Sequence, residues 1–477
     1  MPSLFDRHLK EKREKAKAKK RERQPASQSQ LASAERNPDS VSTLTVERLS
    51  HDGRGIAKDQ YGKITFIAGA LPDEHVNVQI SASHSRFNEG QVSTIKVASS
   101  HRREPQCEHF SACGGCSLQH LVADEQIRFK QKITQEQLQH QTEARAALPL
   151  PEQDPPLVAA EYGYRRKARL ALTETRSQKF SAGFRARDSK QIVAINHCPV
   201  LCSALQSLLP QLQTFLPQLQ GRAHIGHIEL IAAEPQPRVL VRLLRALSAH
   251  DEQLWREFSQ QHQVTIVFAE SAGQGKKSLR YRQLDAAQLR PLMYSVGDIK
   301  LEFQAHDFLQ VNAEINQQMV AQAIDWLQPK SDEVGLDLFC GFGNFTLPLA
   351  LHVKNMTGVE GVNEQVQRAT SNAALNQISN VEFIASDLQQ PLSKARWASQ
   401  SYDFILLDPP RTGAIDICRQ IAELNTKRIL YVSCNPATLA RDAAELVEQG
   451  YEIERYGIMD MFPQTAHSET MILFKRT

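Results

Sequence analysis

The sequence predicts a multidomain α/β protein, made of a small β-barrel, a mixed α/β middle domain and a C-terminal Rossmann-like sheet. Three observations lead to this fold class. The chain has 477 residues, more than one hydrophobic core usually organises. Residues 41–98 consist of short alternating segments separated by turn residues. Across residues 305–477, buried strands alternate with helical stretches, a pattern typical of a doubly wound parallel sheet.

The charge of the chain is nearly balanced but unevenly distributed. Lys and Arg number 56 against 53 Asp and Glu, which gives a net charge of +3. Basic clusters within the first two dozen residues, at 100–104 and at 164–169 favour a polyanionic partner. Residues 1–40 become rich in Ser, Gln, Ala and Pro, and we expect a basic disordered tail there. No apolar run approaches the ~20 residues of a membrane span, and none follows the N-terminal charges, so we expect a cytoplasmic location.

Residues 41–98 predict the small β-barrel. The segments LTVERL, KITFIA, VNVQI and QVSTIKV have the pattern of strands, and HDGRG, GALPDE and FNEG separate them as turns. A barrel of roughly sixty residues beside a basic tail is typical of an OB-like nucleic-acid module. A barrel with a purely structural role is the alternative.

Residues 99–304 predict a mixed α/β middle domain with clustered cysteines near its start. Cys107, Cys113 and Cys116 follow a C-x5-C-x2-C spacing, with glycines that let the loop wrap a metal. Cys198 or Cys202 offers a fourth thiol, and the proline after Cys198 is typical of ferredoxin-type ligation. Four thiolates can hold zinc or an iron–sulfur cluster, and the spacing does not decide between them.

Residues 305–477 carry a candidate cofactor pocket at the carboxyl ends of strands expected in VGLDLFC, MTGVEG, VEFIAS, YDFILLDPP and RILYVSCNP. Gly341 and Gly343 form the first turn, which lacks the third glycine of the dinucleotide fingerprint and therefore argues against NAD. Glu360 can accept both hydroxyls of a ribose, and Asp387 can meet an adenine amino group, although either alone could simply cap a helix. The motif Asp-Pro-Pro-Arg begins at Asp408, after the fourth strand. Together with Glu360 and Asp387 it predicts a pocket for S-adenosylmethionine.

The same edge carries a cysteine and a carboxylate suited to covalent chemistry on uracil. Carbon 5 of uracil is a weak nucleophile, and a thiolate added at carbon 6 creates an enolate that can attack a methyl sulfonium. Cys434 in VSCNP fits this nucleophile, and Glu469 fits the base that removes the carbon 5 proton. His467 is near enough in sequence to assist, with a structural role as the alternative. We expect Cys340 and Cys418 in the core.

Six motifs of the chain resemble those of the RNA uracil-5-methyltransferases. In order they are FLQVN, GLDLFCGFGNFTLPLA, GVEG, LLDPPRTGA, VSCNPATLARD and DMFPQTAHSE. The resemblance implies that Cys434 is the nucleophile and Glu469 the base. It implies contacts with S-adenosylmethionine, or for the first residue with the target base, at Gln310, Phe339, Asn344, Glu360, Asp387 and Asp408. It also implies a metal cluster held by Cys107, Cys113, Cys116 and Cys198.

Within this family the chain looks like the branch that combines a TRAM-type barrel with a four-cysteine [4Fe-4S] cluster and methylates uracil 1939 of 23S rRNA. That likeness implies 23S rRNA as the partner. We expect a monomer, because no heptad pattern or exposed apolar face stands out. Three alternatives stay open: the same chemistry on another 23S rRNA uridine or on tRNA, a non-catalytic RNA-binding assembly factor, and methylation of DNA or protein at nitrogen.

Overall fold

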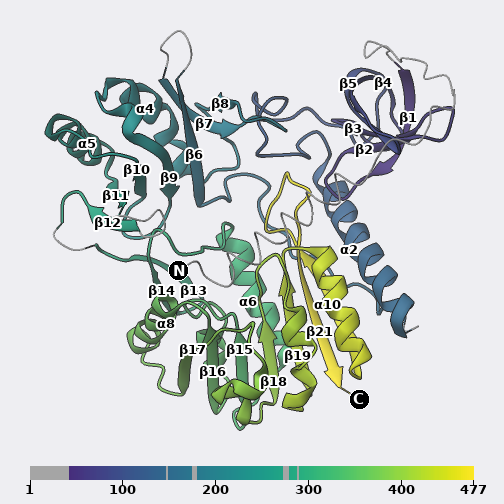
Figure 1. Ribbon diagram of the computed structural model, residues 1–477, viewed down its shortest axis with the longest axis vertical. Coiled ribbons are helices and arrows are strands. Elements are labelled where there is room, and N and C mark those ends of the chain that lie inside the picture. Colours follow the sequence, from purple (N-terminus) through teal and green to yellow (C-terminus); the bar gives the residue numbers. More distant parts are fainter. Residues whose placement is uncertain (1–41, 147–148, 175–179, 272–278, 287–288, 477) are drawn as a thin grey trace, which may run out of the picture.

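The structure is a computed structural model that describes residues 42–146, 149–174, 180–271, 279–286 and 289–476. The predicted basic tail, residues 1–40, lies outside these described residues. Figure 1 shows the barrel, the middle sheet and the C-terminal sheet as three distinct regions of the molecule. In the part of the chain that is described, no helix combines the length and the apolar composition needed to cross a membrane.

A closed β-barrel forms the N-terminal region, as the sequence predicted. Its strands are β1 (Ser42–Leu49), β2 (Gly55–Lys58), β3 (Ile64–Ala68), β4 (His75–Ser83) and β5 (Phe87–Val97). The order around the barrel is β1-β2-β3-β5-β4, and β4 pairs antiparallel with β1 to close it. Alternate side chains, among them those of Val46, Ile67 and Val78, fill its apolar interior.

The middle region is a mixed sheet with helices against it. From edge to edge its strands are β12 (Leu279–Gln283), β11 (Thr265–Ser271), β10 (Arg238–Leu243), β9 (Ile225–Ile231), β6 (Lys167–Glu174), β7 (Phe180–Arg185) and β8 (Ile192–Ala194). Its helices are α3 (Ser203–Gln206), α4 (Leu208–Phe215) and α5 (Ala249–His262), with 3-10 turns at Leu216–Gln218 and Arg222–His224. The rings of Phe215, Trp255 and Phe258 pack together in its core.

The C-terminal region is the predicted doubly wound sheet. From edge to edge its strands are β17 (Val381–Ala385), β16 (Asn355–Glu360), β15 (Val334–Leu338), β18 (Phe404–Leu407), β19 (Arg428–Ser433), β21 (Glu469–Arg476) and β20 (Tyr451–Met459). The first five of these are parallel, and β21 is antiparallel to both of its neighbours. The carboxyl ends of β15, β16, β17, β18 and β19 therefore lie along one edge, where open α/β sheets bind ligands.

Helices cover both faces of this sheet (Figure 1). They are α6 (Ala313–Leu327), α7 (Thr346–Ala350), α8 (Asn363–Leu375), α9 (Ile415–Cys418) and α10 (Pro436–Glu448), with 3-10 turns at Leu392–Lys394, Arg396–Ser399 and Ile421–Leu424. Cys340 and Cys418 are buried here, as expected.

Two elements that precede residue 305 pack on the C-terminal sheet. The hairpin of β13 (Leu292–Val296) and β14 (Ile299–Phe303) lies against α6 and α8. Its ring of Phe303 stacks on Phe342, with centroids 6.2 Å apart. The long helix α2 (Ala123–Ala146) runs along α10, as Figure 1 shows. Residues from the middle of the chain therefore complete the C-terminal core.

The barrel docks on residues 99–122, which we call the junction segment. An apolar cluster joins the two, made of Leu49, Leu71, Leu118 and Leu121. Beside it, the buried carboxylate of Glu74 accepts hydrogen bonds from Arg102 Nε at 2.5 Å and Arg102 Nη2 at 2.8 Å. Because breaking a buried ion pair leaves an uncompensated charge, this contact fixes where the barrel sits.

Candidate functional site

Cys434 lies directly after β19, at the carboxyl edge of the C-terminal sheet. The next residue, Asn435, caps α10 by accepting a hydrogen bond from the backbone N–H of Ala437 at 3.1 Å. Pro436 is the first residue of that helix, where its missing N–H is tolerated. The strand therefore stops at once, and the half-buried thiol faces a cavity of about 750 Å³.

Glu469, the first residue of β21, lies beside Cys434. Burial raises the pKa of the Glu469 carboxyl well above its usual value, Asp408 adds to the increase, and Arg411 opposes it. Burial also raises the pKa of the Cys434 thiol, the Glu469 carboxylate raises it further, and Arg411 lowers it. Two negative charges repel strongly in such a buried space. The site therefore favours a state in which one of the two groups carries a proton.

The turn between β15 and α7 leaves its backbone open to a close ligand. Phe339, Gly341 and Gly343 have positive φ angles of 66°, 56° and 102°. For a side chain as large as that of Phe339 such an angle is strained, and strained backbone clusters at ligand sites. Glu360, at the end of β16, accepts hydrogen bonds from the N–H groups of Gly341 at 3.2 Å and Val362 at 3.0 Å. Its carboxylate thus fixes the turn and stands at the edge of the pocket.

Asn344 and Gln310 are held from elements outside the central sheet. The Asn344 side chain accepts hydrogen bonds from Tyr294 Oη at 2.9 Å and from Asn316 Nδ2 at 3.0 Å, and donates one to Asn316 at 3.0 Å. The carbonyl of the buried Gln310 accepts a hydrogen bond from Arg166 Nε at 2.8 Å. Both predicted cofactor residues therefore depend on the hairpin, α6 and the segment before β6.

Asp387 and Asp408 follow β17 and β18 at the same edge. Asp387 is exposed, and its carboxylate accepts hydrogen bonds from within its own loop, from Gln389 N at 3.0 Å and Gln390 Nε2 at 3.1 Å. Burial raises the pKa of Asp408 to about 7. Glu360, Asp387 and Asp408 therefore lie at or just after the carboxyl ends of β16, β17 and β18, along one edge of the sheet.

Sequence reasoning missed Asp337, which lies inside β15 below the glycine turn. Its buried Oδ2 accepts a hydrogen bond from Thr346 Oγ1 at 2.5 Å. Burial raises its pKa to about 8, and Asp408 and Glu360 contribute to the increase. An acidic residue within the otherwise apolar GLDLF was the available signal.

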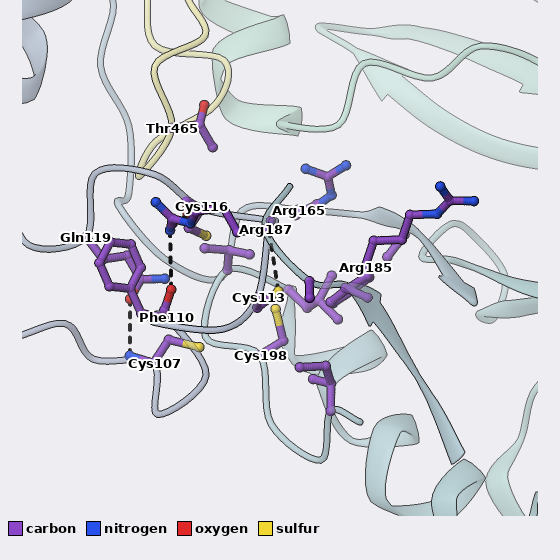
Figure 2. Close-up of a pocket in the computed structure, with 18 of the residues that line it drawn as sticks. Cys107, Phe110, Cys113, Cys116, Gln119, Arg165, Arg185, Arg187, Cys198 and Thr465 are labelled. Carbon is purple, nitrogen blue, oxygen red and sulfur yellow. Dashed lines mark hydrogen bonds between the residues drawn. The ribbon is translucent and has the colours of Figure 1, made fainter. Parts of the chain in front are cut away.

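The clustered cysteines of the junction segment, together with Cys198, line one cavity of about 860 Å³ (Figure 2). Of the two candidates for the fourth position, Cys198 lines this cavity, and Cys202 is not among its described lining residues. Burial raises the pKa of Cys116 to about 11 and that of Cys198 to about 12. Cys107 adds to both increases, so these thiols are close enough to disfavour one another's charge.

Cationic side chains surround the cysteine cavity. They are Arg165, Arg169, Arg185, Arg187, Lys190 and Arg411. The guanidinium of Arg187 donates to the carbonyls of Cys116 at 2.9 Å and Phe110 at 3.3 Å, which holds the cysteine loop closed. Within the described residues, no group of three or more His, Cys, Asp or Glu side chains is arranged to hold a metal ion. The four thiols therefore line the same cavity but are not gathered around a common metal position.

The cysteine cavity and the Cys434 cavity adjoin. Residues that line both include Cys116, Asp188, Arg411, Thr465 and His467. His51 and Asp52, from the turn between β1 and β2 of the barrel, also line the Cys434 cavity. Barrel, junction segment and C-terminal sheet therefore meet at the candidate nucleophile.

The sheet order, the glycine turn and the paired thiol and carboxyl at one edge define a methyltransferase that modifies nucleic acid bases. The chain belongs to the tRNA (Uracil-5-)-methyltransferase family, whose model matches residues 134–477. The model of the TRAM domain matches residues 36–93, over the barrel. The resemblance inferred from the sequence motifs is thereby confirmed.

Relatives match over most of their length. The 23S rRNA (uracil(1939)-C(5))-methyltransferase RlmD of Pseudomonas fluorescens is 44% identical, over 91% of this chain and 93% of that protein. The protein of the same name from Vibrio vulnificus is 41% identical, over 91% of this chain and 96% of that protein.

One solved structure shares the whole fold. The tRNA (uracil-54, C5)-methyltransferase of Pyrococcus abyssi, solved in complex with S-adenosyl-L-homocysteine, has a TM-score of 0.69 and 21% identity to this chain. The match covers 91% of this chain and 99% of that one. At this identity the likeness shows a common fold.

Proposed function

We propose that this chain methylates carbon 5 of uridine 1939 in 23S rRNA, with S-adenosylmethionine as the methyl donor, and that it acts as a monomer in the cytoplasm. Relatives whose names state this activity are 40–44% identical over 91% of the chain. The TRAM barrel supports an RNA substrate. The observation that carries the chemistry is the Cys434 thiol beside the Glu469 carboxyl at the ligand-binding edge of the sheet.

The reaction begins at Cys434. Its thiolate forms a bond to carbon 6 of the uracil, and the electron pair of the double bond moves toward carbon 5 and the O4 oxygen as an enolate. Burial opposes the thiolate, and the Arg411 guanidinium supports it by lowering the pKa of the thiol.

S-adenosylmethionine supplies the electrophilic methyl group that carbon 5 attacks. In our proposal Glu360 accepts the ribose hydroxyls and Asp387 the adenine amino group. The remaining contacts come from Gln310, Phe339, Asn344 and Asp408. The fit rests on the positive φ angles of the glycine turn and on acidic residues after β16, β17 and β18, three parallel strands of the same sheet.

Glu469 completes the reaction as the general base. Its carboxylate takes the proton from carbon 5, the carbon 5–carbon 6 double bond forms again, and the carbon 6–sulfur bond breaks to release Cys434 as a thiolate. A carboxyl whose pKa is raised by burial holds the proton more firmly than an exposed one, which suits this step.

The target base must leave its stack, because carbon 6 is approached from the face of the ring. The Cys434 cavity opens beside the cation-lined cysteine cavity. Arginine and lysine side chains there suit the phosphates that flank a flipped uridine.

We propose that Cys107, Cys113, Cys116 and Cys198 hold a [4Fe-4S] cluster. Four thiols around one cavity, each with a pKa raised by burial, fit a group whose positive metal ions favour thiolates. All four thiols line one cavity of about 860 Å³, which has room for a group of several metal and sulfide ions. When bound, the cluster would hold the junction segment in place beside the catalytic edge.

The test is methyl transfer from radiolabelled S-adenosylmethionine to 23S rRNA transcripts, by the wild type and by Cys434→Ala. We expect label as 5-methyluridine at one site, and a loss of at least ~1,000-fold in the variant because the nucleophile is gone. Cys202→Ala, which removes a thiol outside both cavities, is the matched control and should stay active. Methyl transfer to tRNA alone would show that the substrate is tRNA rather than 23S rRNA, and a fully active Cys434→Ala variant would contradict the covalent chemistry.

A further inference from the structure

The loop of residues 460–468, which joins β20 to β21 and leads directly to Glu469, is held by the N-terminal half of the chain. Lys130 of α2 is buried, and its ammonium donates to Asp460 Oδ1 at 2.5 Å and to the carbonyl of Phe462 at 3.1 Å. Tyr164 Oη donates to the carbonyl of Pro463 at 3.0 Å. The C-terminal sheet therefore supplies the two ends of this loop, and other regions fix its shape.

Gln464 is the centre of these contacts. It is fully buried and has a φ of 68°, a left-handed conformation that is uncommon for a residue with a side chain. Its backbone N–H donates to Gln126 Oε1 at 3.1 Å. Its carbonyl accepts from the N–H groups of Ser117 at 2.9 Å and Leu118 at 3.0 Å, the two residues that directly follow Cys116.

The side chain of Gln464 is engaged at both of its polar atoms. Oε1 accepts from Arg103 Nη2 at 3.1 Å and from Gln126 Nε2 at 3.0 Å, and Nε2 donates to Glu161 Oε2 at 2.9 Å. Two of these partners lie in the junction segment or just after it, and the third lies before β6. A buried network in which every group is satisfied specifies one geometry, and a partial one is costly.

We infer that Gln464 is a positioning residue, which holds Glu469 at Cys434 by tying the 460–468 loop to the junction segment. The inference rests on the proposed function. Glu469 acts only after methyl transfer, when it takes the carbon 5 proton and allows the carbon 6–sulfur bond to break. Loss of the Gln464 contacts therefore slows product release, while thiol addition and methyl transfer continue. The predicted signature is a methylated RNA that stays covalently bound to Cys434.

The experiment is a single-turnover assay with radiolabelled S-adenosylmethionine and 23S rRNA, resolved on a denaturing gel that separates the protein–RNA adduct from free RNA. Gln464→Ala should accumulate the labelled adduct and release product roughly 10- to 100-fold more slowly, because a misplaced catalytic group loses about this much. Gln464→Gly also lacks the side chain but adopts a positive φ without strain. It therefore distinguishes the loss of the side-chain hydrogen bonds from the effect of backbone strain. Glu469→Gln should accumulate the same adduct more completely.

RNA that carries 5-fluorouridine at the target position allows adduct formation to be measured separately from proton removal by Glu469. No proton stands at carbon 5 of that base, so the wild type itself stops at the methylated adduct. Gln464→Ala should form this adduct at the wild-type rate. The matched control is Gln213→Ala, because Gln213 makes a similar network with Ala182 and Ile195 in the middle region, away from the loop. That variant should accumulate no adduct on normal RNA.

Release at the wild-type rate by both Gln464 variants would overturn the inference. So would equal slowing of adduct formation on 5-fluorouridine RNA, because that result would mean general damage to the site. If Gln464→Ala does not fold, the Gly variant decides by the same measurements. A wild type that transfers no methyl to any RNA would instead overturn the proposed function, and the inference with it.

Discussion

The catalytic edge and the joint between the barrel and the junction segment both contain buried carboxyl groups, but the pKa values of these groups are shifted in opposite directions. At the catalytic edge, burial raises the pKa of Asp337 to about 8 and that of Asp408 to about 7. Where the barrel meets the junction segment, burial also acts on Glu74, but hydrogen bonds from Arg102 and the backbone outweigh it and hold the pKa below its usual value. In the first region no cation lowers the pKa of Asp337 or Asp408 among the described residues, and the second region pairs its acid with Arg102.

The two kinds of buried carboxyl group have different roles: one suits catalysis, and the other stabilises the contact between two regions. A carboxyl that is buried without a counter-charge reduces stability at neutral pH, but it can exchange a proton there, which catalytic steps require. A paired carboxylate cannot take up that proton readily, and it fixes the geometry of a joint instead. The junction segment thus holds the barrel and the 460–468 loop at an edge that is tuned for proton transfer.

The largest expected effect comes from removing a thiol from the cysteine cavity. Cys198→Ser should abolish bound iron and sulfide and lower the melting temperature by several degrees, because metal binding contributes to folding. Cys202→Ser is the matched control, since it removes a thiol four positions along the chain but outside the cavity. Iron analysis, visible absorbance and thermal unfolding of anaerobically purified protein are the measurements. Equal loss of iron in both variants would contradict the choice of Cys198, and zinc in the wild type would contradict the cluster.

Much of the fold could be predicted because its signals are local. Short alternating segments with turn residues gave the barrel, and apolar strands followed by Gly or Pro gave the C-terminal sheet. Cys434 belongs to this class, because its exposure follows from the cap at Asn435 and from Pro436, the two residues next to it. Such signals act within a few residues and can be recognised without knowing the tertiary structure.

The parts that escaped prediction depend on contacts far apart in the chain. Gln126 and Gln464 are 338 positions apart, and Lys130 and Asp460 are 330 apart. The packing of α2 along α10 is of the same kind. Cys198 and Cys202 could not be separated from spacing, because only the folded chain brings one of them to the cavity. No periodicity or motif encodes such pairings, which arise when the regions assemble.

The opposite treatment of charge predicts opposite pH dependences of stability. The folded protein holds a proton on Asp337 up to about pH 8, whereas the unfolded chain releases it near its usual pKa of 3.8. Raising the pH between these values therefore favours unfolding. Asp337→Asn, which keeps an acceptor for Thr346, should remove this slope and raise the free energy of unfolding at pH 8 by about 2–4 kcal/mol relative to the wild type. Urea unfolding at pH 5, 7 and 8 measures it.

Glu74→Gln is the counterpart of that experiment at the junction. The pKa of Glu74 is lowered in the folded state, so its contribution to stability is present at neutral pH and is lost as the pH falls through that pKa. The variant should therefore be less stable than the wild type at pH 7 and approach it at low pH. The same slope for both variants would contradict the distinction between the two regions.

The smallest expected effect concerns Arg411, a cation that lowers the pKa of both catalytic groups. Because its side chain is exposed, water screens it, and Arg411→Met should slow alkylation of Cys434 by iodoacetamide only roughly two- to fivefold at neutral pH. The rate should rise with pH in both proteins, because the thiolate is the reactive form. Lys190→Met is the control, since Lys190 lines the cysteine cavity but not the Cys434 cavity. Mass spectrometry of the alkylated peptide gives the rates. An equal effect of the two variants would mean that the reactivity of Cys434 depends on the general basic surface, whereas an effect of Arg411 alone would identify Arg411 as a specific counter-charge for the nucleophile.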